Sequence, residues 1–121
     1  MLTYHLALSP VHVERIRSEL AMLSSHTAAS MQKLPYLNAC INEALRLYPP
    51  QPSGLLRLTP PSGITIAGTY IPADVIVKAP HWTIARLDSA FDKPDEFIPE
   101  RWTADKEMVK DERAHAPFSI G

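Results

Sequence analysis

The sequence predicts an α+β fold in which two longer helices precede a small β-sheet and an irregular C-terminal segment. Apolar residues recur with the helical period over residues 9–24 and 34–48. From residue 55 to residue 79 the pattern changes to short β-branched runs separated by turn residues. Proline accounts for 12 of the 121 residues, about twice the usual ~5%. Because most of these prolines follow the second helical segment, the second half is expected to be extended and rich in loops.

The first of the two longer helices is expected over residues 9–24. Ser9 is a typical N-cap residue, and Pro10 suits the first helical position because its missing N–H is not needed there. The apolar residues 1–7 have no cap of their own, and we interpret them as the end of a preceding helix. Residues 24–32 are polar and lack a period, which indicates a loop.

The second helix, residues 34–48, is expected to be largely buried. Pro35 favours its start, and Pro49 and Pro50 end it. Apolar side chains cover most of its circumference and leave only a polar strip that includes Glu43 and Arg46. This i,i+3 pair is either a solvated surface pair or a buried pair that needs further partners.

The second half is expected to form short strands and then a segment with little regular structure. Strands are predicted over residues 55–59, 64–66, 70–71 and 75–77, and a short helix over residues 81–87. Residues 91–121 form the irregular part, within which residues 103–113 are charged and expected to be solvated. A sheet this small must pack on another element.

Composition excludes several classes of function. The net charge of −1 without a basic stripe argues against a nucleic-acid partner. No apolar run approaches the ~18 residues of a membrane span, and no signal segment is recognisable, so we expect neither in this chain. The single cysteine, Cys40, sits at an apolar helical position and is expected to be a small buried hydrophobe rather than a metal ligand. The five histidines are scattered without ligand spacing, so no metal site is predicted.

Several short motifs occur in a specific order and spacing. They are Glu43-Ala44-Leu45-Arg46, then Pro49-Pro50, then Arg57, then Pro99-Glu100-Arg101-Trp102, and finally Pro117-Phe118-Ser119-Ile120-Gly121. Together they resemble the C-terminal part of a cytochrome P-450, a haem-thiolate monooxygenase, over nearly the whole chain. The resemblance implies an α+β fragment of the mainly α-helical cytochrome P-450 fold. The residues within and around the motifs look most like those of fungal members that modify secondary metabolites.

The resemblance also implies roles for individual residues. Glu43, Arg46 and Arg101 match a buried structural triad, which is physically reasonable because one carboxylate can accept from two guanidinium groups. The triad has one excess positive charge, so backbone carbonyls of residues 91–102 are expected to accept the remaining donors. Other matched positions are Arg57, Phe118 and Gly121 for binding haem, and Gly54, Leu55 and Leu56 for the substrate pocket. Asp74 departs from the family pattern, in which glycine is frequent there.

The implied activity is insertion of one oxygen atom from O₂ into a small organic substrate, with haem as cofactor and an NADPH-dependent reductase as partner. A parent of this kind is expected at the endoplasmic reticulum membrane. The cysteine that binds iron in the family would follow Gly121 and is absent from these residues. The alternative expectation is therefore a catalytically inert truncated or pseudogene product that forms no haem-thiolate centre and folds poorly by itself.

Overall fold

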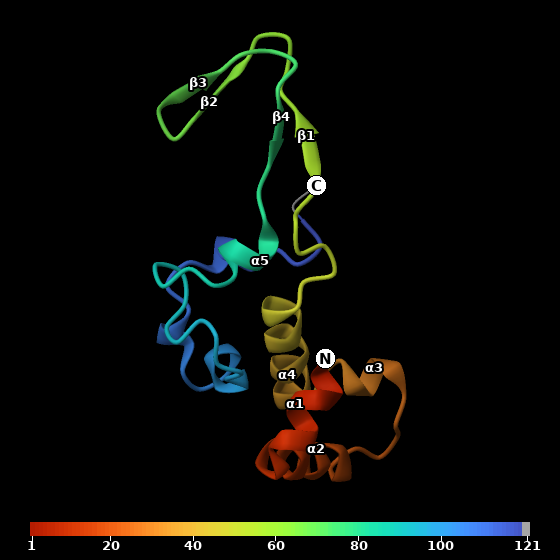
Figure 1. Ribbon diagram of the computed structural model, residues 1–121. Coiled ribbons are helices and arrows are strands. Elements are labelled where there is room, and N and C mark those ends of the chain that lie inside the picture. The colour runs from red at the N-terminus through yellow and green to blue at the C-terminus, as the bar shows by residue number, and fades with distance from the viewer. Residues whose placement is uncertain (120–121) are drawn as a thin grey trace.

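The computed structural model describes residues 1–119 and has helices in its first half, paired strands next and 3-10 turns last (Figure 1). The α-helices are α1 (Leu2–Leu8), α2 (Pro10–Ala21), α3 (Ala28–Met31), α4 (Pro35–Leu47) and α5 (His81–Ile84). The strands are β1 (Leu56–Leu58), β2 (Ile64–Ile66), β3 (Thr69–Ile71) and β4 (Ile76–Lys78). The 3-10 turns are η1 (Pro99–Trp102), η2 (Lys106–Met108) and η3 (Glu112–Ala114). The predicted α+β class is confirmed.

Helix α4 lies at the centre of the helical body and contacts α1, α2 and η1. Figure 1 shows α1 and α2 at its N-terminal end and the C-terminal irregular segment beside it. It starts at Pro35 and ends one residue before Tyr48, close to the expected bounds. Leu34 occupies its N-cap and offers no side-chain cap. The Glu19 carboxylate of α2 accepts the backbone N–H groups of Tyr36 and Leu37 instead. A cap from another helix therefore satisfies donors that the local sequence leaves open.

Two helical details differ from the expectation. Helix α2 ends at Ala21 rather than at residue 24, and Ser9 is its N-cap residue but makes no capping side-chain bond. Helix α3 lies inside the segment expected to be a loop. The side chains of Thr27 and Ser30 form a capping box that stabilises this single turn. A helix of four residues is too short to show an apolar period, so the pattern could not reveal it.

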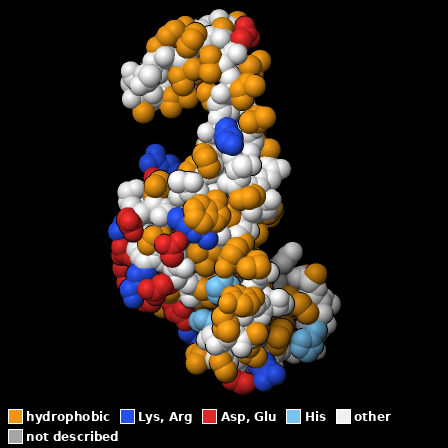
Figure 2. Space-filling model, in the orientation of Figure 1, with side chains coloured by type: hydrophobic (Ala, Val, Ile, Leu, Met, Phe, Trp, Pro, Cys, Tyr) orange, Lys and Arg blue, Asp and Glu red, His pale blue; other side chains and the backbone are white. Residues whose placement is uncertain are grey.

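The strands form two separate antiparallel ladders rather than the single small sheet expected. Strand β1 pairs with β4, and β2 pairs with β3 in the segment that connects them. Figure 1 shows the two ladders as an arm that extends away from the helices. Figure 2 shows hydrophobic side chains over this arm, and Leu56, Leu58 and Ile76 are each more than 60% exposed.

The turn before β4 explains the departure at Asp74. Asp74 adopts a φ of +59°, a left-handed conformation that glycine adopts freely and that aspartate tolerates better than most residues. The backbone therefore has the conformation that glycine would favour, with aspartate in its place.

The irregular segment is anchored to α4 although it contains little regular structure. Turn η1 packs on α4, Phe91 is fully buried, and it forms an isolated bridge with Val109. Residues 103–113, expected to be charged and solvated, contain η2 and the first two residues of η3. The backbone N–H groups of Lys110 and Asp111 donate to the Ala90 carbonyl. None of the helices in residues 1–119 has the length and hydropathy needed to cross a membrane.

Candidate functional site

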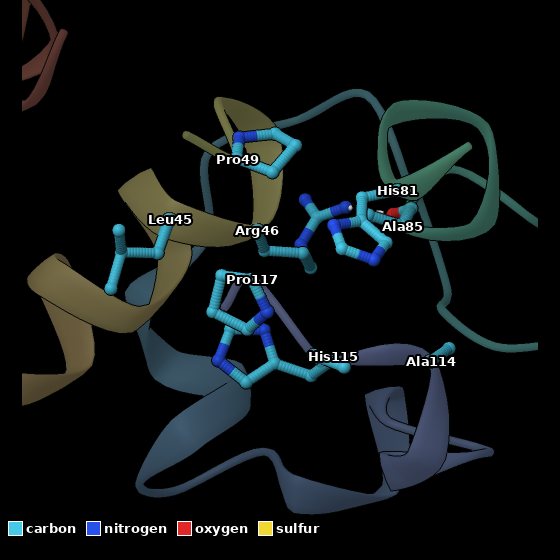
Figure 3. A pocket seen from close by; sticks show the side chains of 9 residues that line it. Leu45, Arg46, Pro49, His81, Ala85, Ala114, His115 and Pro117 are labelled. Atoms are coloured by element: carbon cyan, nitrogen blue, oxygen red, sulfur yellow. Dashed lines mark hydrogen bonds between the residues drawn. The ribbon is translucent and has the colours of Figure 1, made fainter. Parts of the chain in front are cut away.

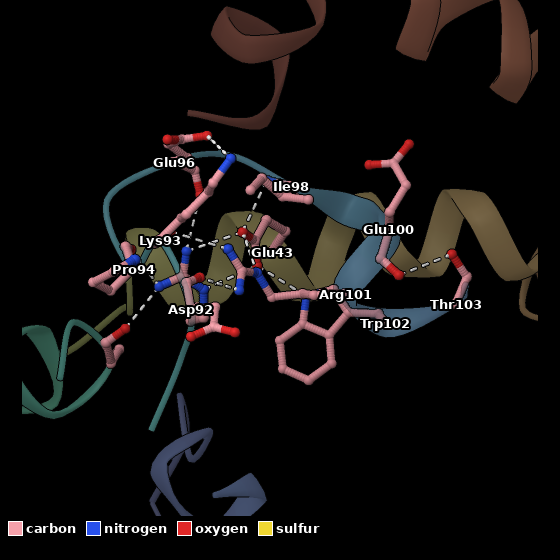
Figure 4. Close-up of polar contacts among 12 residues, drawn as sticks. Glu43, Asp92, Lys93, Pro94, Glu96, Ile98, Glu100, Arg101, Trp102 and Thr103 are labelled. Carbon is pink, nitrogen blue, oxygen red and sulfur yellow. Dashed lines mark hydrogen bonds and ion pairs between the residues drawn. The ribbon is translucent and has the colours of Figure 1, made fainter. Parts of the chain in front are cut away.

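A buried ion cluster joins α4 to η1. We call it the Glu43 cluster; it consists of Glu43 and Arg46 on α4 and Arg101 on η1, all 0–1% exposed. The Glu43 carboxylate lies 2.9 Å from Nε of both arginines and 2.9 Å from a terminal nitrogen of Arg46. It also accepts the backbone N–H of Ile98 at 3.0 Å and the indole N–H of Trp102 at 2.9 Å. Figure 4 shows Arg101, Ile98 and Trp102 arranged around the Glu43 carboxylate.

Backbone carbonyls accept the other guanidinium donors. Arg46 donates to the carbonyls of Ala85, Pro94 and Glu96 at 2.6–3.1 Å. Arg101 donates to the carbonyls of Asp92 and Lys93 at 2.7 and 3.2 Å. All of these carbonyls except that of Ala85 lie in the segment 91–102. The irregular course of this segment thus aims its carbonyl groups at two cations.

The charges of the cluster fix the protonation state of Glu43. Burial by itself would raise the pKa of this carboxyl, but the hydrogen bonds and positive charges of Arg46 and Arg101, with the Ile98 N–H, outweigh it. The pKa of Glu43 therefore lies below its ordinary value. The carboxylate is ionised and saturated with donors, so the cluster can hold two segments together but has no free group to offer a substrate.

Trp102 and Ile98 are contacts of Glu43 that the sequence analysis did not identify. Trp102 directly follows Arg101 in the motif, so its contact with Glu43 could have been predicted from its position. The contact of the Ile98 backbone N–H could not, because every residue except proline carries such a group. The Trp102 ring also contacts the His115 ring, with centroids 4.5 Å apart and the two planes tilted by 48°. The indole thus connects the Glu43 cluster to the segment near the C-terminus.

A second polar chain ties α2 to α4 and η1. The Tyr36 hydroxyl donates to the Glu100 carboxylate at 2.9 Å, and His12 Nδ1 lies 2.7 Å from the same hydroxyl. The hydroxyl has one proton and gives it to the carboxylate, so His12 Nδ1 must be the donor in its contact. Arg15 pairs with Glu100 and covers the Tyr36 ring at 4.0 Å.

Arg57, on β1, borders two cavities between the arm and the C-terminal segment. One cavity of about 280 Å³ has Leu55, Ile66 and Val77 among its walls, and a second of about 290 Å³ includes Arg113. Arg57 contacts the Ser119 hydroxyl at 3.5 Å. The arrangement combines a cation with apolar walls, which suits an apolar ligand that carries an acidic group.

The residues predicted for the substrate pocket have different surroundings. Leu55 lines the first cavity. The side chain of Leu56, the next residue along, is 68% exposed, because successive side chains of a strand point to opposite faces. Gly54 has a φ of +74°, and a Cβ there would lie 2.0 Å from the Ala79 carbonyl oxygen. A close backbone approach therefore explains this glycine.

The remaining predicted positions lie at or near the end of the described segment. Phe118 is 72% exposed, and Gly121 falls outside the described residues. Cys40 lies in the core with Ile16 and Tyr36, away from Arg57. Burial, followed by the nearby carboxylates of Glu100 and Glu19, raises the pKa of the Cys40 thiol to about 11. Within residues 1–119, no group of three or more His, Cys, Asp or Glu side chains could hold a metal.

Comparisons of this chain with a family model and with similar proteins all indicate the same family. The family model described as Cytochrome P-450 matches residues 1–121. Similar proteins include the cytochrome P-450 monooxygenases FCK2 of Fusarium pseudograminearum, 54% identical over 92 residues, and phqL of Penicillium fellutanum, 46% identical over 113 residues. These alignments cover 76% and 93% of this chain. Tryprostatin B 6-hydroxylase of Aspergillus fumigatus is 41% identical over 125 residues, which cover 99% of this chain and 22% of that protein.

A solved structure supports the same fold. The chain resembles retinoic acid-bound cyanobacterial CYP120A1 with a TM-score of 0.84 and 29% identity, over 99% of this chain and 28% of that one. The chain spans 17% of the Fusarium protein's length and 20% of the Penicillium protein's length.

Proposed function

This chain belongs to the cytochrome P-450 family, and from that premise we propose that it forms part of a haem-dependent monooxygenase that inserts one oxygen atom from O₂ into a small organic substrate. The observation that carries the proposal is the setting of Arg57. Its guanidinium group borders two cavities and lies beside Ser119, while Leu55 and Val77 supply apolar walls.

The residues present fit the acidic edge of a haem. When bound, haem supplies the iron chemistry that activates O₂, using electrons from a reductase. The Arg57 guanidinium would donate to a haem carboxylate, since its planar fork matches that group. Leu55 and Val77 would contact the porphyrin face and exclude water. We propose that Phe118 and Gly121 belong to the segment that leads to the iron ligand.

The Glu43 cluster would serve this site indirectly. Its three side chains are buried, and its donors are directed to Glu43 and to backbone carbonyls. We therefore assign the cluster a positioning role. By joining α4 to the segment that ends beside Arg57, it would hold the haem-contacting residues at fixed positions. In this respect its three residues act as a structural triad and not as a catalytic acid or base.

The 121 residues by themselves are proposed to form no haem-thiolate centre. Cys40 is the single cysteine of the sequence, it is 0% exposed, and its raised pKa keeps the thiol protonated. It also packs in a core that does not include the walls of the Arg57 cavities. The catalytically inert product is therefore the alternative function, and a thiolate-type red shift of the Soret band in reduced, carbon-monoxide-treated chain would overturn it.

Substrate, partner and location are proposed from the family. The similar Aspergillus protein is named as a hydroxylase of tryprostatin B, and a small organic molecule of fungal secondary metabolism is the substrate class we propose here. We further propose an NADPH-dependent reductase as the electron donor and the endoplasmic reticulum membrane as the location of the whole protein. The formal charge of −1 gives no support to a nucleic-acid partner.

Haem retention tests the role of Arg57. In the full protein that contains this chain, Arg57→Leu should weaken haem binding roughly 10- to 100-fold, because a hydrogen bond to a charged group contributes about 1.5–3 kcal/mol. Arg57→Lys should recover part of the loss. Arg17→Leu, on the exposed face of α2, is the matched control that should not change retention. Equal haem content and equal haem dissociation rates in Arg57→Leu and the control would refute the assignment.

A further inference from the structure

Two buried imidazole nitrogens at one small cavity lack a hydrogen-bond partner among residues 1–119. Nδ1 of His81, at the start of α5, and Nδ1 of His115, near the C-terminus, are both inaccessible and lack a hydrogen bond within the described residues. Figure 3 shows both rings at this cavity, which the two histidines line together with α4. A buried polar atom left without a partner costs about 1–3 kcal/mol.

The other groups around the cavity cannot satisfy these nitrogens. Its remaining walls are the side chains of Leu45, Arg46, Pro49, Ala85, Ala114, Ala116 and Pro117. Arg46 is the only polar one of these. Its five N–H groups are already directed to Glu43 and to the carbonyls of Ala85, Pro94 and Glu96. Among residues 1–119, therefore, no side chain at the cavity is left to act as the partner.

The size and charge of the cavity select that partner. The cavity measures about 10 Å³, which is about the volume that one water molecule needs. Arg46 contributes a positive charge to the wall and so disfavours a metal cation. Burial lowers the pKa of His115, so a neutral imidazole faces the cavity.

We propose that His81 and His115 bind one internal water molecule, which bridges their Nδ1 atoms. Water both donates and accepts, so it satisfies either tautomer of each ring. The bridge connects His115 in the C-terminal segment to His81 at the start of α5, beside α4. It thereby positions the segment that continues to Ser119 and the Arg57 cavities. His81 also lines both Arg57 cavities, so the water site adjoins the proposed haem site, although neither the water nor its test requires haem.

A crystal structure of the full protein, at a resolution that reveals ordered water, tests the site directly. The expected result is one water within hydrogen-bonding distance of both Nδ1 atoms. A metal ion identified by anomalous scattering, a chloride ion, or a direct contact between the two imidazoles would overturn the proposal.

Substitutions test the bridge energetically. Asparagine places a polar atom near the position of the imidazole Nδ1, whereas leucine has a similar shape without one. His115→Leu should raise the unfolding equilibrium constant about tenfold, which corresponds to about 1.4 kcal/mol, and His115→Asn should raise it less. The double variant His81→Leu/His115→Leu should cost less than the sum of the single variants, because it leaves no nitrogen in need of a partner.

The exposed His26 provides the matched control, and His26→Leu should leave the equilibrium constant within about twofold. Additive effects of His81→Leu and His115→Leu, within the same twofold margin, would overturn the bridge. Should the leucine variants fail to fold, the asparagine variants still decide the question, because the water must remain in their electron density.

Discussion

Replacing Glu43 with glutamine removes one charge from the buried cluster and changes its shape very little. In the native protein, Glu43 Oε1 accepts from Arg46, Ile98 and Arg101, while Oε2 accepts from Arg46 and Trp102. Glutamine has one acceptor oxygen, so in either orientation at least two of these donors would face its NH₂ group. The two guanidinium groups would also lose their only carboxylate among the contacts of the cluster.

The expected loss of stability follows from this burial. Removing one partner of a buried ion pair costs about 3–5 kcal/mol, because it leaves an uncompensated charge. A domain is stabilised by about 5–15 kcal/mol in total, so Glu43→Gln should remove a large fraction of the free energy of unfolding. An exposed pair contributes about 0.2–1 kcal/mol by comparison.

Urea unfolding of the full protein, followed by circular dichroism, measures this loss. The matched control is Glu14→Gln on α2, since Glu14 pairs with Arg17 while both side chains are more than 60% exposed. We expect a shift in midpoint several times larger for Glu43→Gln at an unchanged slope. Free energies of unfolding for the two variants that agree within about 0.5 kcal/mol would refute the role of the buried cluster.

Four other predictions follow from the same geometry. Arg101→Ala should abolish folding and haem incorporation together. Normal expression with full haem content would show that Arg101 does not have the structural role proposed for the cluster. The pKa of Glu43 is lowered from 4.5 in the folded state, so at acidic pH the unfolded state binds a proton more readily than the folded state does. Stability should therefore fall as the pH drops below about 4.5. A Glu43→Gln variant whose stability falls equally with pH would contradict this. Asp74→Gly should keep or raise stability by up to ~1 kcal/mol, and Asp74→Val should lower it by about 1–2 kcal/mol, because φ is +59°; a valine variant that melts at the same temperature as the glycine variant would refute the strain. The Cys40 thiol should react with an alkylating reagent at pH 8 only after unfolding, and rapid labelling of the folded protein would show that it is accessible.

The main helices could be predicted because their signals are local. Pro35 at the start, Pro49 and Pro50 at the end, and an apolar period between them place α4 within a residue of its observed bounds. The motif that contains Arg101 could be matched to the family from its residues alone. Helix α3 and the separation of the strands into two ladders were not predicted, because a four-residue turn has no period and strand pairing depends on distant partners.

The sequence by itself determined the order of helices and strands, the burial expected of α4 and the resemblance that identifies the family. Only the tertiary structure decided which groups meet. Carbonyls of residues 91–102 were expected to accept from the arginines, but the structure selected those of Asp92, Lys93, Pro94 and Glu96 and added that of Ala85. It also supplied Glu19 as the cap of α4 and placed His81 and His115 at one cavity. The physical reason is that backbone carbonyls have no residue-specific signal and that partners distant in sequence become neighbours only when the chain packs. Burial then makes each of these polar groups require a partner.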